Sequence, residues 1–136
     1  MDNHEIKYAP TYEVTFCIGS REGYNGPAFT REDVLNRINK FQHEFHKSMP
    51  VKVSDAVTFT MKDYSENGWE VSAITYPNSP ANREDVDSFM NGLAENLLYH
   101  FKQNRITIRH LLHPIYGNIL TTVMLEMKDA EKTYRK

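Results

Sequence analysis

The residues best suited to chemistry in this chain are its single cysteine and its six histidines, and their spacing limits what they can do. Cys17 lies inside the alternating run VTFCIG, which is typical of a β-strand, where a thiol is usually an inert packing residue. His43 and His46, in HEFH, have the i, i+3 spacing of a helix, which holds a metal only with further carboxylate or thiol ligands. No such ligands are placed near them, or near His110 and His113. The sequence therefore predicts no catalytic residue, no cofactor and no metal site.

The acidic residues are also explained without catalysis. Asp33 and Asp85 each lie three residues after a helix-capping side chain, and no carboxylate pair has a spacing that requires acid/base chemistry. The serines lie in loops without a nucleophile-elbow pattern. Whether the chain is an enzyme is left open at this stage, because active sites also assemble from distant residues.

A glycine-rich loop is the best candidate for ligand binding. The segment GSREGYNG, residues 19–26, precedes a predicted helix, and the free N–H groups at a helix start can hold an anion. It matches neither G-x-G-x-x-G nor G-x-x-x-x-G-K-[ST]. We expect the N–H groups from Gly26 to Thr30 to form the anion site, Tyr24 to act as a lid, and Arg21 and Asn25 to contribute polar contacts.

Positive charge gathers in the last third of the chain. No acidic residue occurs between Glu95 and Glu126, whereas Arg105 and Arg109 do occur there. Arg105 and Arg109 lie in a predicted strand that begins just after Gln103. The expected strand order brings the start of that strand to the same end of the sheet as the glycine-rich loop. Gln103, Arg105 and Arg109 therefore complete the predicted ligand site.

These side chains must be positioned by secondary-structure elements, and the sequence contains two similar helix starts. The stretches TREDV, at 30–34, and NREDV, at 82–86, both resemble capping boxes at helix starts. Apolar residues then recur with helical spacing along 34–45 and along 86–97. We expect the first helix to end near Met49–Pro50, because proline disfavours helical geometry in the preceding residue, and the second to run to about Gln103.

Alternating strands precede and follow each helix, along 12–18, 51–64, 69–75, 105–112 and 119–127. The order βαββαβ predicts an α+β, ferredoxin-like split βαβ sandwich with strand order 4-1-3-2, both helices on one face, and an extra C-terminal strand beside the fourth. We expect one domain, 1–136, with its core in about 11–127 and flexible tails at 1–10 and 128–136.

The alternation also predicts the two faces of the sheet. Val57, Phe59 and Met61 should face the helices, while Cys17, Arg109 and many threonines should face away. Such a hydroxyl-rich open face favours contact with a second copy, so we predict a homo-oligomer. The RNA recognition motif shares this topology, but Phe16 should face the helices here, leaving no aromatic platform for bases. With a net charge of −2, this argues against nucleic-acid binding.

The chain has no signal-like leader and no apolar run near the ~20 residues of a membrane span, so we expect no membrane association and a cytoplasmic protein. We predict a non-enzymatic, homo-oligomeric protein that binds a small anionic ligand, either a nucleotide or another phosphate metabolite. Two alternatives remain open. One is an interaction or inhibitor protein anchored by Tyr8, Tyr12 and Tyr116. The other is an enzyme whose site lies between subunits.

Overall fold

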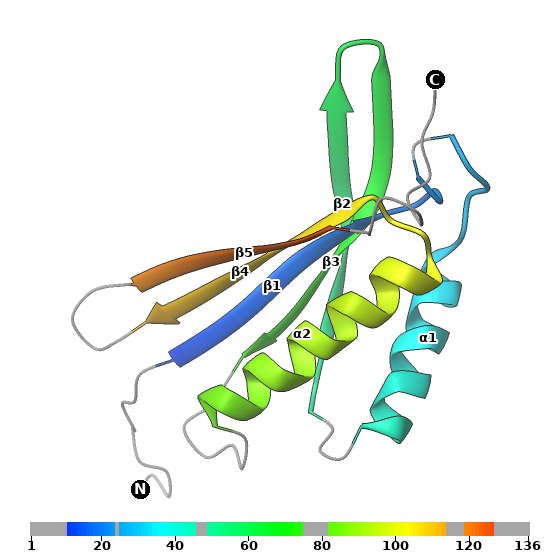
Figure 1. Ribbon diagram of the computed structural model, residues 1–136. Helices are drawn as coiled ribbons and strands as arrows, with labels where there is room; N and C mark the ends of the chain where they lie inside the picture. The colour runs from blue at the N-terminus through cyan, green and yellow to red at the C-terminus, as the bar shows by residue number, and fades with distance from the viewer. Residues whose placement is uncertain (1–10, 24, 46–48, 75–81, 114–118, 127–136) are drawn as a thin grey trace, which may run out of the picture.

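A five-stranded sheet with two helices packed on it makes up the computed structural model, which describes residues 11–23, 25–45, 49–74, 82–113 and 119–126 (Figure 1). Its elements are, in chain order, β1 (Thr11–Gly19), α1 (Arg31–Glu44), β2 (Lys52–Met61), β3 (Tyr64–Ile74), α2 (Arg83–His100), β4 (Arg105–His113) and β5 (Ile119–Glu126). The molecule is therefore of the mixed α+β class that the sequence predicts.

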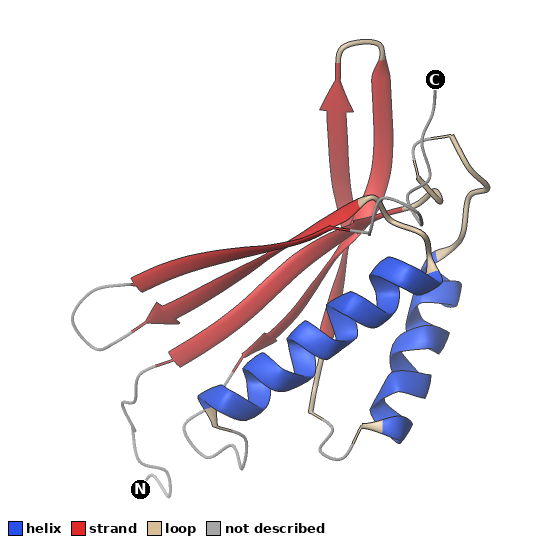
Figure 2. Ribbon diagram, in the orientation of Figure 1, coloured by secondary structure: helices blue, strands red, loops and turns tan. Residues whose placement is uncertain are grey.

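The strand order is β2-β3-β1-β4-β5, and every neighbouring pair is antiparallel. The first four strands thus have the predicted order, and β5 pairs with β4 as expected. Because β1 and β2 both run antiparallel to β3, they are parallel to each other, and α1 connects them; α2 connects β3 and β4 in the same way. Both helices lie on one face of the sheet (Figure 2), which leaves the other face open in the described part of the chain.

Both predicted capping boxes are confirmed. The Thr30 and Asn82 side chains accept the N–H groups of Asp33 and Asp85, whose carboxylates accept the cap N–H groups in return. The predicted helix ends were too late, since α1 ends at Glu44 and α2 at His100. Phe45 has extended backbone angles (φ −82°, ψ 141°), which turn its ring onto Phe89 at a centroid distance of 5.3 Å.

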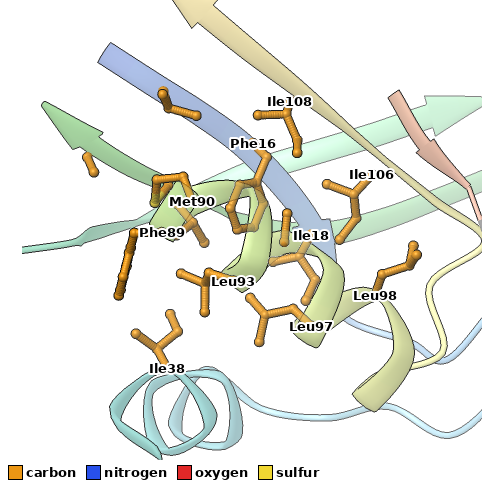
Figure 3. Packing of buried hydrophobic residues seen from close by; sticks show 14 of the residues in the cluster. Phe16, Ile18, Ile38, Phe89, Met90, Leu93, Leu97, Leu98, Ile106 and Ile108 are labelled. Carbon is orange, nitrogen blue, oxygen red and sulfur yellow. The ribbon is translucent and has the colours of Figure 1, made fainter. Parts of the chain in front are cut away.

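The hydrophobic core lies between the sheet and the helices (Figure 3). The spacing of apolar residues in α2 accounts for it, because Phe89, Leu93 and Leu97 recur on one helix face and are fully buried. The strands contribute residues from alternate positions, which are Val14, Phe16, Ile18, Val71, Ala73, Ile106 and Ile108. Longer and more apolar than α1, α2 supplies most of the helical share of the core.

The outer half of β2 faces the opposite way from the sequence prediction. Its pairing with β3 shifts by one residue between Ser54 and Val57, so that Phe59 pairs with Glu66, and Met61 with Tyr64, on the open face. The side chains of Phe59 and Met61 are 39% and 56% exposed and lie outside the core. The prediction that Val57, Phe59 and Met61 face the helices is therefore wrong, because a β-bulge reverses the alternation.

The β2–β3 hairpin projects beyond the other strands (Figure 1). Asp63, at its tip, has a positive φ of 60°, as tight turns require. No helix in the described part of the chain combines the length and apolarity needed to cross a bilayer. The tails predicted at 1–10 and 128–136 lie outside the described residues.

Candidate functional site

A cavity of about 630 Å³ lies on the open face of the sheet, where the β2–β3 hairpin leaves it. One wall is the hairpin, which contributes Phe59, Met61 and Tyr64. The opposite wall is the turn between α2 and β4 together with Gly23, and the floor is formed by β1 and β4. The large apolar side chains are on the hairpin wall and the turn wall is polar, so a ligand in this cavity meets two different surfaces.

Two glycines, Gly19 and Gly68, pair across β1 and β3 and leave space above the sheet that other side chains occupy. A Cβ on Gly19 would lie 2.5 Å from the Oε2 atom of Glu66. A Cβ on Gly68 would lie 2.3 Å from the Ile18 carbonyl oxygen and 2.9 Å from the ring of Phe59. The missing side chains therefore let Glu66 and Phe59 fold down over the sheet.

Glu66 brings a fixed negative charge to the cavity. Its Oε2 atom accepts the backbone N–H of Arg21 at 2.8 Å, and its Oε1 atom accepts the Tyr64 hydroxyl at 2.8 Å. The side chain is half-buried and comes from β3, so both of its oxygens are oriented by the frame of the sheet. A carboxylate held in this way is suited to pairing with a cationic group of a ligand.

The polar wall is fixed by the side chain of Gln103. Its Oε1 atom accepts the Gly19 N–H at 3.0 Å, and its Nε2 atom donates to the Arg21 carbonyl at 2.9 Å. The same turn is tied to the glycine-rich loop, because the Gly23 N–H donates to the Lys102 carbonyl at 2.8 Å. Gln103, 7% exposed, therefore positions the wall more than it offers contacts to a ligand.

Positive charge enters the cavity from β4. Arg105 and Arg109 both line it, with Thr107 between them on the same face of the strand. Four residues of β-strand span about 13 Å, at ~3.3 Å per residue. The cavity can thus meet an extended ligand with an arginine near each end and the Glu66 carboxylate on the β3 side.

The predicted site residues divide into two groups. Gln103, Arg105 and Arg109 line the cavity, whereas Arg21, Asn25, Gly26 and Thr30 do not. Arg21 contributes its main chain to the hydrogen bonds of Glu66 and Gln103, and its guanidinium donates to the Gly26 carbonyl at 3.4 Å. Tyr24 lies outside the described residues.

The predicted anion site in the loop has little free hydrogen-bonding capacity. The Gly26 N–H donates to the Glu22 carbonyl, and the Phe29 N–H donates to the Ser20 carbonyl. The Thr30 N–H donates to the Asp33 carboxylate at 2.9 Å. These groups close a small loop and cap α1, so the cavity is a better-formed site than the loop.

Most residues that line the cavity were not predicted as site residues, among them Phe59, Tyr64, Glu66 and Asn104. No motif in the sequence marks Glu66. Phe59 could not be recognised as a cavity residue because of the β-bulge in β2: simple alternation places Phe59 in the core. The signal that remained in the sequence was the pair of glycines, Gly19 and Gly68, at positions where strands favour larger side chains.

Cys17 lies at the floor of the cavity, opposite Glu70 on β3. Burial, and then the charge of Glu70, raise the pKa of the Cys17 thiol, which outweighs the opposing effect of Arg109. Less thiolate is therefore present at pH 8 than in a free cysteine.

We expect iodoacetamide to alkylate Cys17 at pH 8 at least about fivefold more slowly than it alkylates a free cysteine. A ligand in the cavity should slow the reaction further. Because the chain has one cysteine, intact mass reports this rate directly. The same chain in denaturant, reacting at the free rate, is the control; equal rates for folded and denatured chain would contradict the burial of the thiol.

A second polar cluster lies on the helix face of the sheet, away from the cavity. The Tyr12 hydroxyl donates to the Asp87 carboxylate, and His110 Nδ1 lies 2.7 Å from the hydroxyl and 2.9 Å from Asp87 Oδ1. Burial, and then the hydrogen bond to Asp87, raise the pKa of Tyr12 well above its usual range. Tyr12 is 3% exposed, so the prediction that it is an exposed anchor is wrong; Tyr8 and Tyr116 lie outside the described residues.

Within the described ranges, no group of three or more His, Cys, Asp or Glu side chains is arranged to hold a metal ion. His43 is in the last turn of α1, as its helical spacing implied. His46, its predicted neighbour on the helix, is not among the residues described.

Two solved structures match the chain over nearly its whole length. No protein-family profile and no curated protein matches it. One solved structure, described as a phage SAM lyase in the apo state, superposes with a TM-score of 0.69 at 15% identity, covering 94% of this chain and 100% of the other. A second, described as a phage SAM lyase in complex with S-methyl-5'-thioadenosine, gives 0.59 at 14% identity, covering 95% and 100%. This chain therefore shares their fold.

This finding overturns the prediction of a non-enzymatic protein that binds an anionic ligand. The structures that share the fold along their full length are described as those of an enzyme, and one of them holds a neutral thioether nucleoside. The prediction failed because it searched for contiguous motifs. The cavity instead assembles single residues from β1, β2, β3, β4 and two connecting segments.

Proposed function

We propose that this protein is a lyase that cleaves S-adenosylmethionine (SAM) and releases S-methyl-5'-thioadenosine. The observation that carries the proposal is the full-length fold similarity to the phage SAM lyase structures, at TM-scores of 0.69 and 0.59. A cavity of about 630 Å³ with polar, apolar and charged walls supports it, because small-molecule sites fall in the range of roughly 300–1,000 Å³.

The product defines the bond that breaks. S-methyl-5'-thioadenosine keeps the methyl and adenosyl groups on sulfur, so the bond from sulfur to the γ-carbon of the amino-acid chain is cleaved. The bonding pair stays on sulfur, and the cationic sulfonium becomes a neutral thioether. A lyase adds no water, so the four-carbon fragment must supply its own electron pair, by closing a ring through its carboxylate or by losing a proton from its β-carbon.

The charges of the cavity match those of SAM. The sulfonium and the ammonium are cations, and the Glu66 carboxylate is held in place by Tyr64 and the Arg21 N–H. The substrate carboxylate is an anion, and Arg105 and Arg109 line the same cavity. In this proposal these three side chains bind and orient the substrate, and the apolar hairpin wall excludes water.

We also propose that the molecule acts as a homo-oligomer in the cytoplasm and that its fold is a ferredoxin-like split βαβ sandwich with an added strand. Exposed Phe59 and Met61 on the projecting hairpin support self-association, because a second copy would bury them. The strand order supports the fold assignment. A single cysteine suits a reducing compartment.

The test is to incubate the purified protein with SAM and follow both products by mass spectrometry. We expect time-dependent release of S-methyl-5'-thioadenosine, and a four-carbon co-product one water lighter than homoserine. A reaction in ¹⁸O-water distinguishes lyase chemistry from hydrolysis, since a lyase leaves the label out of the initial co-product. The absence of S-methyl-5'-thioadenosine at high protein concentration would refute the proposal.

A further inference from the structure

Phe59 offers a ligand in the cavity the most exposed aromatic surface. Among the described residues, three aromatic side chains line the cavity, which are Phe16, Phe59 and Tyr64. Phe16 is 1% exposed and belongs to the core, and the Tyr64 hydroxyl donates to Glu66. Phe59 is 39% exposed and comes from the hairpin wall. An aromatic ring with this much free surface beside a small-molecule cavity can contact an apolar part of the ligand.

The backbone of β3 holds the Phe59 ring in place. The ring leans from β2 across the neighbouring strand, so that a Cβ on Gly68 would lie 2.9 Å from its Cε2 atom. An aromatic side chain that covers a glycine of the adjacent strand is a stabilising arrangement in β-sheets. The ring is therefore positioned before a ligand arrives, which reduces the entropy lost on binding.

We propose that the adenine base of the ligand stacks on Phe59; this inference rests on the proposed function. Glu66 lies directly opposite Phe59 in the pairing of β2 with β3, and the Cβ atoms of such pairs are roughly 4.5–5.5 Å apart. With the sulfonium beside Glu66, the ribose spans this short distance and carries the base onto the ring. Adenine is the flat, aromatic part of SAM, and any base can stack on an aromatic side chain through its π-face.

The competing arrangement places the sulfonium over the Phe59 ring, because aromatic faces also attract cations. The two arrangements predict different losses when the ring is removed. S-methyl-5'-thioadenosine and SAM both contain the base, whereas only SAM carries the positive charge. Stacking therefore predicts equal losses for a cationic and a neutral ligand, and a contact with the cation predicts a loss confined to the cationic one.

The test measures two affinities by calorimetry, for S-methyl-5'-thioadenosine and for an uncleavable SAM analogue with a protonated amine in place of the sulfonium. Phe59→Leu retains an apolar side chain and removes the aromatic face. We expect both ligands to bind at least about fivefold more weakly, with the two losses within about threefold of each other, because stacking of one base contributes about 5- to 150-fold to affinity.

Tyr99→Leu is the matched control. Tyr99 is also 39% exposed, but it lies on α2 and does not line the cavity. Its replacement should change neither affinity by more than about twofold. Melting temperatures within a few degrees of wild type show that each variant is folded.

Phe59→Trp provides a second variant, in case leucine disturbs the hairpin. Indole keeps an aromatic face, so both affinities should stay within about threefold of wild type. The emission of the new tryptophan should fall when either ligand binds, and the wild type, whose single tryptophan is Trp69, gives the background.

Unchanged affinities in a folded Phe59→Leu would overturn the inference, and so would a loss confined to the cationic analogue. If Phe59→Leu does not fold, unchanged emission of Phe59→Trp on ligand binding would overturn it. The proposed function survives each of these results if the wild type still cleaves SAM. Failure of the wild type to bind either ligand, together with no cleavage, would refute both.

Discussion

Replacing Glu66 with glutamine should weaken SAM binding by about 10- to 100-fold and leave binding of S-methyl-5'-thioadenosine within about threefold of wild type. Glutamine keeps the shape of the side chain and removes its charge. A charge-assisted contact contributes roughly 1.5–3 kcal/mol, and only SAM carries a sulfonium and an ammonium for the carboxylate to meet. The neutral product loses no such contact. Calorimetry with both ligands measures the two affinities on the same protein preparation.

The control is Glu70→Gln, which changes the net charge equally. Glu70 lies four residues further along β3, on the same face of the strand, but outside the lining of the cavity. We expect Glu70→Gln to change SAM affinity by less than about threefold, because salt largely screens charges separated by more than about 10 Å. Equal losses in the two variants would mean that Glu66 acts only through long-range charge. Equal losses for SAM and its product would remove the proposed pairing with the substrate cation.

Steady-state kinetics of Glu66→Gln then tell how the carboxylate contributes. As the sulfur–carbon bond breaks, the sulfonium loses its positive charge, so a nearby anion stabilises the substrate at least as well as the transition state. Such a contact lowers KM without raising kcat. We therefore expect KM to rise and kcat to stay within about threefold. A fall in kcat of about a thousandfold with an unchanged KM would assign Glu66 to proton removal from the four-carbon fragment instead.

The helix starts and the strand order were accessible to sequence reasoning because they depend on local chemistry. Thr30 with Asp33, and Asn82 with Asp85, form capping boxes that operate within four residues of each other. Once two helix starts are fixed, the connections between five short strands leave few topologies. Gln103, Arg105 and Arg109 were placed in the site by the same argument, and all three line the cavity.

The remainder of the cavity depends on a register shift that sequence alternation does not reveal. The alternation of Val57, Phe59 and Met61 is regular, yet the bulge after Ser54 turns all three toward the open face. One inserted residue thus moves two large apolar side chains from the expected core to a ligand-facing wall. Tyr64 and Glu66 pair with those residues, so the same shift determines which side chains surround Glu66.

Replacing Phe89 with alanine should destabilise the fold by about 3–5 kcal/mol, as truncation of buried phenylalanines usually does. Phe89 is 0% exposed and joins the two helices, with its ring 5.3 Å from Phe41 and 5.3 Å from Phe45 in edge-on contacts. The loss is a large share of the roughly 5–15 kcal/mol that stabilises a domain. For a chain of this size we expect the melting temperature to fall by roughly 10 °C or more.

Phe89→Leu is the matched control, because it retains most of the apolar volume and should cost less than about 1.5 kcal/mol. Phe45 is the informative partner: it leaves α1 one residue after the helix ends, and its ring is held by Phe89 and Phe41. If the aromatic contacts explain the early end of α1, Phe45→Ala combined with Phe89→Ala should cost less than the sum of the single changes. Strict additivity, measured by urea unfolding, would mean that the two rings stabilise the fold independently and that another contact ends the helix at Glu44.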